Sequence, residues 1–297
     1  MSVVTSGVVT SGVAAALAAA VAARAAARLG ARRPPLGRAV WDRTNHAGRT
    51  VTLLEGPAWA LGAVVPLAIH RSPAARAGLL ATTAAASLGA LDDHVGSTAV
   101  KGLRGHLAAL RRGEPTTGVV KIVGLAATGV LATALIDRPR WGSARPGAAE
   151  LLGLLVGGAV VAGAANLVNL FDLRPGRALK VVLLTAPLTA TLGPGRDQVG
   201  PPARTRDAAT LASAAVGASL GLLPDDLAGR SMLGDTGANA AGALLGTAVV
   251  AGCRLPGRAA ALAILTGLVL ASERVSFTAV IEASPVLRAV DAWGRAT

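Results

Sequence analysis

Long apolar runs separated by short polar gaps dominate the chain. A helix needs about 20 apolar residues to cross roughly 30 Å of hydrocarbon. Ala, Gly, Leu and Val fill the runs, and such small residues let helices approach closely in lipid. The pattern predicts an all-α, polytopic transmembrane helix bundle, formed as a single domain over residues 1–297. The nine predicted spans are 3–23, 51–69, 74–91, 117–136, 148–168, 177–193, 207–223, 236–252 and 257–272.

The composition agrees with a membrane protein. The chain is 52% hydrophobic and 15% charged, with a mean hydropathy of +0.55, whereas a soluble domain is about 25% charged. These values exclude a disordered, fibrous or disulfide-built protein. The net charge of +13 raises the question of nucleic acid, but two Phe, four Trp and no Tyr leave few rings to stack on bases. We therefore expect no nucleic-acid partner and assign the basic loops to lipid headgroups.

Charges around the first apolar run set the predicted orientation. No charge precedes Arg24, and several arginines follow it. A cleavable signal peptide carries its positive charge before the apolar run. The run is therefore predicted to be an anchor helix with its N-terminus outside. We expect a multi-pass protein of the plasma (inner) membrane whose cytoplasmic gaps are 24–50, 92–116, 166–176, 224–235 and 273–297.

Three compact polar motifs adjoin apolar runs on this predicted cytoplasmic side. Ionisable groups at membrane depth are costly and indicate function by default. The motifs are Leu91-Asp92-Asp93-His94, Asn166-Leu-Val-Asn169-Leu-Phe-Asp172-Leu-Arg174-Pro-Gly-Arg177 and Gly234-Asp235-Thr236-Gly237-Ala-Asn239.

Carboxylates in these motifs predict a metal site. Asp92 and Asp93 repel each other unless a cation or a proton compensates. Brought near Asp235, they would form an oxygen-rich pocket for Mg²⁺, with Mn²⁺ as the alternative. Gly234 and Gly237 flank Asp235 at a helix start, where free N–H groups favour phosphate.

Other polar residues predict a diphosphate partner for the metal. Asn166 and Asn169 share one helix face, with Asp172 one turn further along. Basic side chains that could neutralise a diphosphate are Lys101, Arg104, Arg174 and Arg177. Each motif alone also has a purely structural interpretation, as a helix cap or a turn. The histidines likewise have one, as loop or packing residues: His46, His94 and His106. The coincidence of three motifs on one predicted side favours a metal and diphosphate site at the membrane surface.

The ordered motifs resemble the polyprenyl-phosphate N-acetylhexosamine-1-phosphate transferase family over about residues 40–280. The matching elements are Leu91-Asp92-Asp93, Lys101-Gly-Leu, Asn166-Leu-Val-Asn169-Leu-Phe-Asp172 and Gly234-Asp235-Thr236-Gly237-Ala, with a looser match from Asn45-His46 to Pro57. The resemblance implies transfer of a sugar 1-phosphate from a UDP-sugar to a polyprenyl phosphate, with release of UMP.

The resemblance also implies roles for particular residues. Asp235 would be the main Mg²⁺ ligand, and Asp92 and Asp93 would position the metal or deprotonate the lipid phosphate. Lys101 would contact phosphate. The residues implied to bind substrate are His46, Asn166, Asn169, Asp172, Arg174, Arg177, Gly234 and Gly237.

Several features depart from the family pattern. Pro175 replaces a second aspartate that follows Asp172 in the family, and residues 273–297 contain no histidine, which leaves the sugar open. The family has ten or eleven spans, whereas nine are predicted here. After the last span, apolar residues recur at helical spacing and predict an amphipathic helix on the membrane: Val286, Leu287, Val290 and Trp293.

Two other functions remain open. An ion-coupled transporter would place its polar groups near the bilayer midplane, whereas a transferase would gather them at one face. A degenerate family member would bind lipid diphosphates without turnover. The expected partners are polyprenyl phosphate, a UDP-sugar, the membrane and, as an open alternative, a second copy of the chain in a homodimer.

Overall fold

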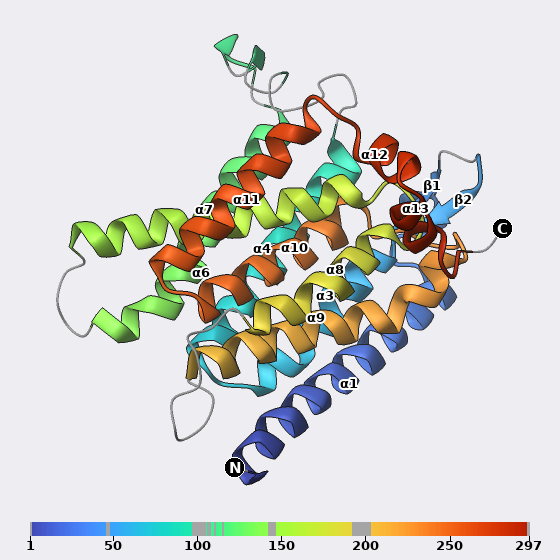
Figure 1. Ribbon diagram of the computed structural model, residues 1–297. Helices are drawn as coiled ribbons and strands as arrows, with labels where there is room; N and C mark the ends of the chain where they lie inside the picture. Colours follow the sequence, from blue (N-terminus) through green and yellow to red (C-terminus); the bar gives the residue numbers. More distant parts are fainter. Residues whose placement is uncertain are drawn as a thin grey trace.

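Helices occupy all nine predicted apolar segments in the computed structural model (Figure 1), which describes residues 2–45, 48–96, 105, 108–109, 111–114, 116–141, 147–191 and 203–295. Six of them are long and apolar enough to cross a membrane, whereas α3 and α8 have 15 residues each. The all-α membrane fold is therefore supported, and the count of nine crossings stays a prediction. The helices are α1 (Ser2–Arg32), α3 (Glu55–Ile69), α4 (Pro73–Val95), α6 (Thr117–Trp141), α7 (Ala148–Phe171), α8 (Arg177–Thr191), α9 (Ala203–Leu227), α10 (Gly234–Gly252) and α11 (Leu255–Ser272).

Several helices continue past the predicted ends of their apolar runs. Helix α1 extends through Arg24 and Arg28 to Arg32, and α4 includes Asp92 and Asp93. Alanine and arginine are strong helix formers, so the helix persists after the apolar run has ended. Asp92, Asp93, Asn166, Asn169 and the motif that starts at Gly234 consequently lie on helix ends, whereas Asp172 and Arg174 lie in the turn between α7 and α8.

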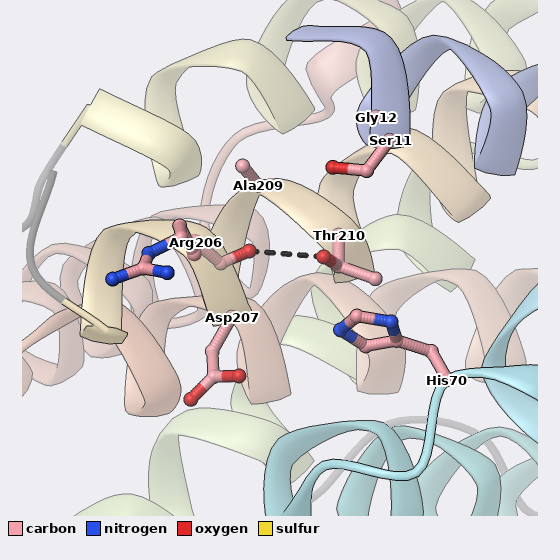
Figure 2. Close-up of a pocket in the computed structure, with 7 residues that line it drawn as sticks. All are labelled: Ser11, Gly12, His70, Arg206, Asp207, Ala209 and Thr210. Atoms are coloured by element: carbon pink, nitrogen blue, oxygen red, sulfur yellow. Dashed lines mark hydrogen bonds between the residues drawn. The ribbon is translucent and has the colours of Figure 1, made fainter. Parts of the chain in front are cut away.

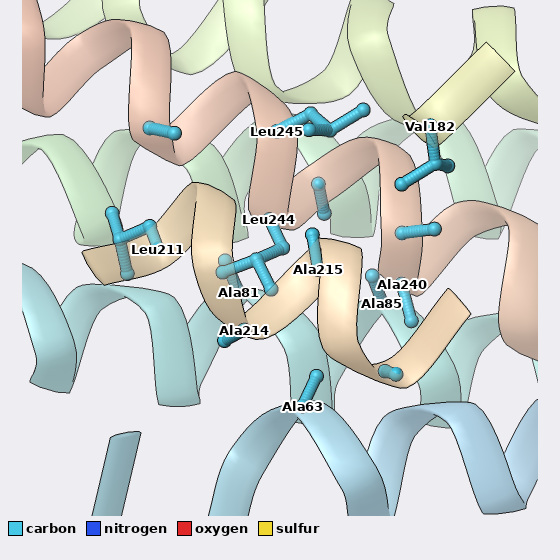
Figure 3. Close-up of a cluster of buried hydrophobic side chains, with 14 of the residues drawn as sticks. Ala63, Ala81, Ala85, Val182, Leu211, Ala214, Ala215, Ala240, Leu244 and Leu245 are labelled. Atoms are coloured by element: carbon cyan, nitrogen blue, oxygen red, sulfur yellow. The ribbon is translucent and has the colours of Figure 1, made fainter. Parts of the chain in front are cut away.

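Helix α10 forms the centre of the bundle, in contact with α3, α4, α7 and α9. All of its residues are buried except Asp235 and Val249. In Figure 3, Leu244 and Leu245 of α10 lie among apolar side chains of the surrounding helices. A Cβ at Gly242 would come within 2.2 Å of the Ala164 carbonyl oxygen, so glycine is required for α7 to approach this closely.

A short hairpin is the only strand structure in the described part of the chain. After α2 (Arg38–Trp41), strands β1 (Asp42–Thr44) and β2 (Thr50–Thr52) pair antiparallel, with Arg43 opposite Val51. An isolated bridge joins Thr52 to Ser231. The connection from α1 to α3 is therefore tied to the loop that leads into α10.

The predicted C-terminal helix is present as α13 (Pro285–Ala292), which follows α12 (Phe277–Ala283). Both pack on the turn between α7 and α8. The Phe277 ring stacks on Phe171 with 4.9 Å between ring centroids, and Asp291 pairs with Arg177. Val286 and Trp293 remain exposed, as expected of an amphipathic segment.

Candidate functional site

The three polar motifs meet at one end of the bundle, which we call the site end. The ends of α4, α7 and α9 and the starts of α3, α6, α8 and α10 lie there, because these helices alternate in direction. Asp93 of α4 bonds to the start of α10, and the backbone N–H of Gly234 bonds to Asp172. The structure thus brings together motifs that are up to 143 residues apart in the sequence.

Asp93 caps the N-terminus of α10. Its Oδ1 accepts the backbone N–H of Asp235 at 2.9 Å, and its Oδ2 accepts the N–H of Thr236 at 2.9 Å and the Thr236 hydroxyl at 2.7 Å. The first N–H groups of a helix have no partner within the helix, and they favour a negative charge. A Cβ at Gly89 would meet the Asp235 carbonyl oxygen at 2.2 Å, so this glycine permits the contact between α4 and α10.

Gly234 is required by the turn that starts α10. Its φ is +60°, a conformation that residues with a side chain rarely adopt. A Cβ there would also lie 3.0 Å from Asp93 Oδ2. Gly237 serves packing instead, since its Cβ would lie 2.7 Å from the Cα of Gly56 in α3. Both glycines therefore have structural roles, and their predicted role in binding phosphate stays a prediction.

Lys121, in the second turn of α6, had no role in the predicted site, yet it lies at its centre. Its Nζ donates to Asp92 Oδ2 at 2.6 Å and also to Asp235 Oδ2. All three side chains are largely buried. One ammonium thus offsets the repulsion between two carboxylates from different helices. The only feature of the sequence that could have indicated this role is the position of Lys121, a single lysine at the start of a long apolar run.

The predicted Mg²⁺ site was to be formed by Asp92, Asp93 and Asp235, and the structure fits a site with two of these carboxylates better than one with three. The described residues contain no group of three or more His, Cys, Asp or Glu that could hold a metal. Both oxygens of Asp93 accept hydrogen bonds from the start of α10, so Asp93 acts as a helix cap, and its role as a metal ligand stays a prediction. Asp92 and Asp235 remain, and Mg²⁺ commonly takes one or two carboxylates together with substrate phosphates.

A cavity of about 360 Å³ lies at the site end, and it is connected to the start of α10 through Asp172, which lines it and accepts the backbone N–H of Gly234. Asp226 and Asp172 line it, and the buried Oδ2 atom of each has no hydrogen-bond partner among the described residues. Burial raises the pKa of Asp172 well above its usual value, the charge of Asp226 raises it further, and the Gly234 N–H partly opposes both. The cavity thus combines buried acids with the basic side chains of Arg49, Arg174 and Arg295.

Other predicted residues differ in their availability. Asn166 and Asn169 lie half-buried on the last turns of α7. Arg174 lines the cavity and pairs with Glu282 at 3.6 Å. Arg177 is only 4% exposed and pairs with Asp291 at 2.7 Å, so its predicted role in neutralising a diphosphate is not supported. The sequence did not indicate this burial, because it results from the C-terminal helices α12 and α13, which cover Arg177.

Four predicted residues lie outside the described part of the chain: His46, Lys101, Arg104 and His106. His94 lies within the described part of the chain, and its contacts are those of a packing residue. Its ring packs edge-on against Trp41, and its Nδ1 lies 2.8 Å from the Ala90 carbonyl oxygen.

A different cavity, of about 240 Å³, lies at the opposite end of the bundle (Figure 2). It contains none of the predicted site residues, and the Thr210 hydroxyl in its wall donates to the Arg206 carbonyl oxygen at 3.0 Å. The residues that line it are Ser11, Gly12, His70, Arg206, Asp207, Ala209 and Thr210. Among the described residues, the predicted site residues therefore lie at the site end and not around this cavity.

No family model and no curated protein matches this chain. The functional interpretation consequently depends on the motifs and on the geometry of the site end.

Proposed function

We propose that the chain transfers a sugar 1-phosphate, of the N-acetylhexosamine type, from a UDP-sugar to a polyprenyl phosphate at the cytoplasmic membrane face. The observation that carries this proposal is the meeting of Asp92, Lys121 and Asp235 at the site end, where a cavity lined by further acidic and basic groups also lies. Mg²⁺, or Mn²⁺ in its place, is the proposed cofactor, and UMP is the second product.

In the proposed reaction, an oxygen of the lipid phosphate attacks the phosphorus that carries the sugar. The bond from that phosphorus to the bridging oxygen breaks, and UMP leaves with the electron pair. The Lys121 ammonium, which pairs with Asp92, would neutralise charge on the phosphates, and the Asp92 carboxylate would accept a proton still present on the lipid phosphate. Mg²⁺ held by Asp92 and Asp235 would act as a Lewis acid on the diphosphate oxygens.

The surroundings of the three residues suit two chemically different substrates. Leu91 and Ile122, the neighbours of Asp92 and Lys121 in the sequence, are exposed and apolar, which suits a polyprenyl chain entering from the lipid. The cavity of about 360 Å³ lies on the side of Asp172 and suits the nucleotide. Its arginines would contact phosphate or ribose, and its buried acids would bind donors of the base.

A UMP-release assay tests the proposal. The purified full chain is incubated with polyprenyl phosphate, Mg²⁺ or Mn²⁺, and each of several UDP-N-acetylhexosamines. We expect UMP release with at least one sugar and a loss of about 100-fold or more in Asp235→Asn and Lys121→Met. Glu150→Gln at the opposite end is the matched control and should keep full activity. Absence of release with every sugar, or full activity in Asp235→Asn, would overturn the proposal.

One observation favours a second candidate, a binding protein without turnover. Lys121 occupies the position between the two carboxylates that a metal would share. This candidate predicts tight UDP-sugar binding, measured by calorimetry, with no UMP release under any metal condition. A transporter is less well supported, because Asp92, Asp172 and Asp235 all lie at the site end rather than along a path through the bundle.

A further inference from the structure

A separate cavity of about 330 Å³ lies at the site end between α1, α9 and the start of α3. Of the predicted motifs it includes only part of the loosely matching segment from Asn45 to Pro57, and none of the predicted site residues line it. Arginines of α1 line one side of it, and the Glu55–Ser231 pair lines the other. The remaining lining residues are mostly small or apolar: Ala27, Ala31, Thr52, Leu54 and Leu222, with Asp225 and Arg230 beside them.

Glu55 lines this cavity and carries a buried carboxyl oxygen that the described residues leave without a partner. The residue is 2% exposed, and its Oε2 accepts the Ser231 hydroxyl at 2.5 Å. Its Oε1 is buried without a hydrogen-bond partner among the described residues. Leaving a buried carboxylate oxygen unpaired is costly, which points to a ligand that donates a hydrogen bond there.

Arg28 provides the complementary group. Arg24 and Arg230 are both engaged by Asp225, Arg24 at 2.5 Å. Arg28 also lines the cavity and is exposed, and its side chain makes no ion pair or hydrogen bond with the described residues. A guanidinium group fits the oxygens of a phosphate. The cavity therefore contains one unpaired cationic group, on Arg28, and one acidic group with an unpaired oxygen, on Glu55. These two groups together match a ligand that carries both an anionic and a cationic group, a zwitterion.

The position of the cavity along α1 matches the lipid headgroup region. Val13, Leu17 and Val21 are exposed on α1, as expected in contact with hydrocarbon. Arg24 and Arg28 follow within two turns. Such a change from apolar to basic residues occurs where a helix leaves the hydrocarbon for the headgroup layer.

We propose that this cavity binds the phosphoethanolamine headgroup of a membrane aminophospholipid. The phosphate would contact Arg28, and the ammonium would donate to Oε1 of Glu55. The acyl chains would extend along the exposed apolar side of α1, which commits the proposal to a lipid rather than a soluble compound. Ser231 lines both this cavity and the proposed nucleotide cavity, so the lipid would stabilise a wall shared by the two. The inference does not depend on transferase activity.

Native mass spectrometry of the detergent-purified full chain tests the proposal. It measures the binding of phosphatidylethanolamine, phosphatidylcholine and phosphatidylglycerol. Phosphatidylethanolamine should bind at least about tenfold more tightly than phosphatidylcholine, whose trimethylated nitrogen cannot donate a hydrogen bond. Glu55→Gln should abolish this preference. Arg28→Ala should weaken phosphatidylethanolamine binding by about tenfold or more, whereas Arg32→Ala, an exposed arginine outside the cavity, should not.

Three results would overturn the proposal. One is equal binding of phosphatidylethanolamine and phosphatidylcholine. Another is binding that Arg28→Ala leaves unchanged, and this variant alters an exposed side chain, so it keeps the test valid if Glu55→Gln fails to fold. The third is equally tight binding of soluble glycerophosphoethanolamine, which would assign the cavity to a free metabolite. Circular dichroism of every variant checks that helix content is unchanged.

Discussion

Asp93 links α4 to α10 through three hydrogen bonds to one helix start. We predict that Asp93→Ala lowers the free energy of unfolding by about 2–3 kcal/mol, because it removes a charged cap and leaves two N–H groups unpaired. Thr236→Val, which removes only the hydroxyl bond, should cost about 1 kcal/mol. Unfolding of the detergent-solubilised chain by increasing SDS measures both. Equal stability of Asp93→Ala and the parent chain would contradict the cap.

Lys121 is held by two carboxylates at once, which leads to a second prediction at the level of single residues. Lys121→Met should destabilise the fold because it leaves Asp92 and Asp235 close together without a counter-charge. Adding Asp235→Asn should recover part of the loss, with a coupling of about 1–3 kcal/mol in the double-mutant cycle. The same SDS titration measures the four proteins. Purely additive effects would show that the three residues do not act together.

The roles of these residues depended on contacts that the sequence does not contain. The clustering of Asp92, Asp93 and Asp235 was predictable from their placement at successive helix ends. Which of these aspartates caps a helix and which ones pair with Lys121 was not predictable. Asp93 becomes a cap only because Gly89 allows α4 to touch the start of α10. Lys121 was overlooked because a lysine at a helix start is usually explained by the membrane boundary alone.

At the level of elements, α13 is attached to α8 through Asp291. Burial raises the pKa of Asp291, but the hydrogen bonds from Arg177 and Arg295 outweigh it, and the net pKa is lower than usual. A carboxyl with a lower pKa in the folded state stabilises the fold above its unfolded pKa, and this contribution is lost as the pH falls through the folded value. The attachment of α13 should therefore be strong at neutral pH and weaken below about pH 4.

Hydrogen exchange of residues 277–295 checks this attachment. Asp291→Asn should raise exchange at pH 7, because it leaves Arg177, only 4% exposed, without its acidic partner. Exchange in the parent chain should rise when the pH falls below about 4. Glu282→Gln is the matched control: its pair with Arg174 is exposed and 3.6 Å long, so little change is expected. Unchanged hydrogen exchange in Asp291→Asn would contradict the attachment of α13 to α8 through Asp291.

Helix positions were more predictable than helix ends. The apolar runs located all nine major helices, because length and hydropathy decide where a chain can cross lipid. The end of α1 was missed because its Ala- and Arg-rich sequence keeps a favourable helix propensity beyond Arg24. The end of α4 was missed because its last turn is held by a tertiary contact, from Asp93 to the start of α10. The amphipathic pattern at Val286 to Trp293 predicted α13, but the pattern contains no information that its polar side would cover Arg177.

At the scale of the whole molecule, the alternating direction of the helices explains why the described candidate residues gather at one end. Helix α7 connects the two ends, since its first turn lies by the buried Arg258–Asp137 pair and its last turn precedes Asp172. Arginines are present at both ends, so the bias in positive charge that sets orientation is modest. The predicted cytoplasmic position of the site end therefore needs a direct test.

Cysteine labelling tests the orientation. Cys253 is the only cysteine and is buried, so Cys253→Ala provides a background without thiols. Ala148→Cys and Leu173→Cys then place one exposed thiol at each end of α7. In intact bacterial cells, a membrane-impermeant maleimide should label Ala148→Cys alone, because the positive-inside rule places the site end in the cytoplasm. Both variants should react after permeabilisation, which controls for buried thiols. Labelling of Leu173→Cys in intact cells would place the site outside, away from any cytoplasmic pool of UDP-sugar, and would also count against the proposed reaction.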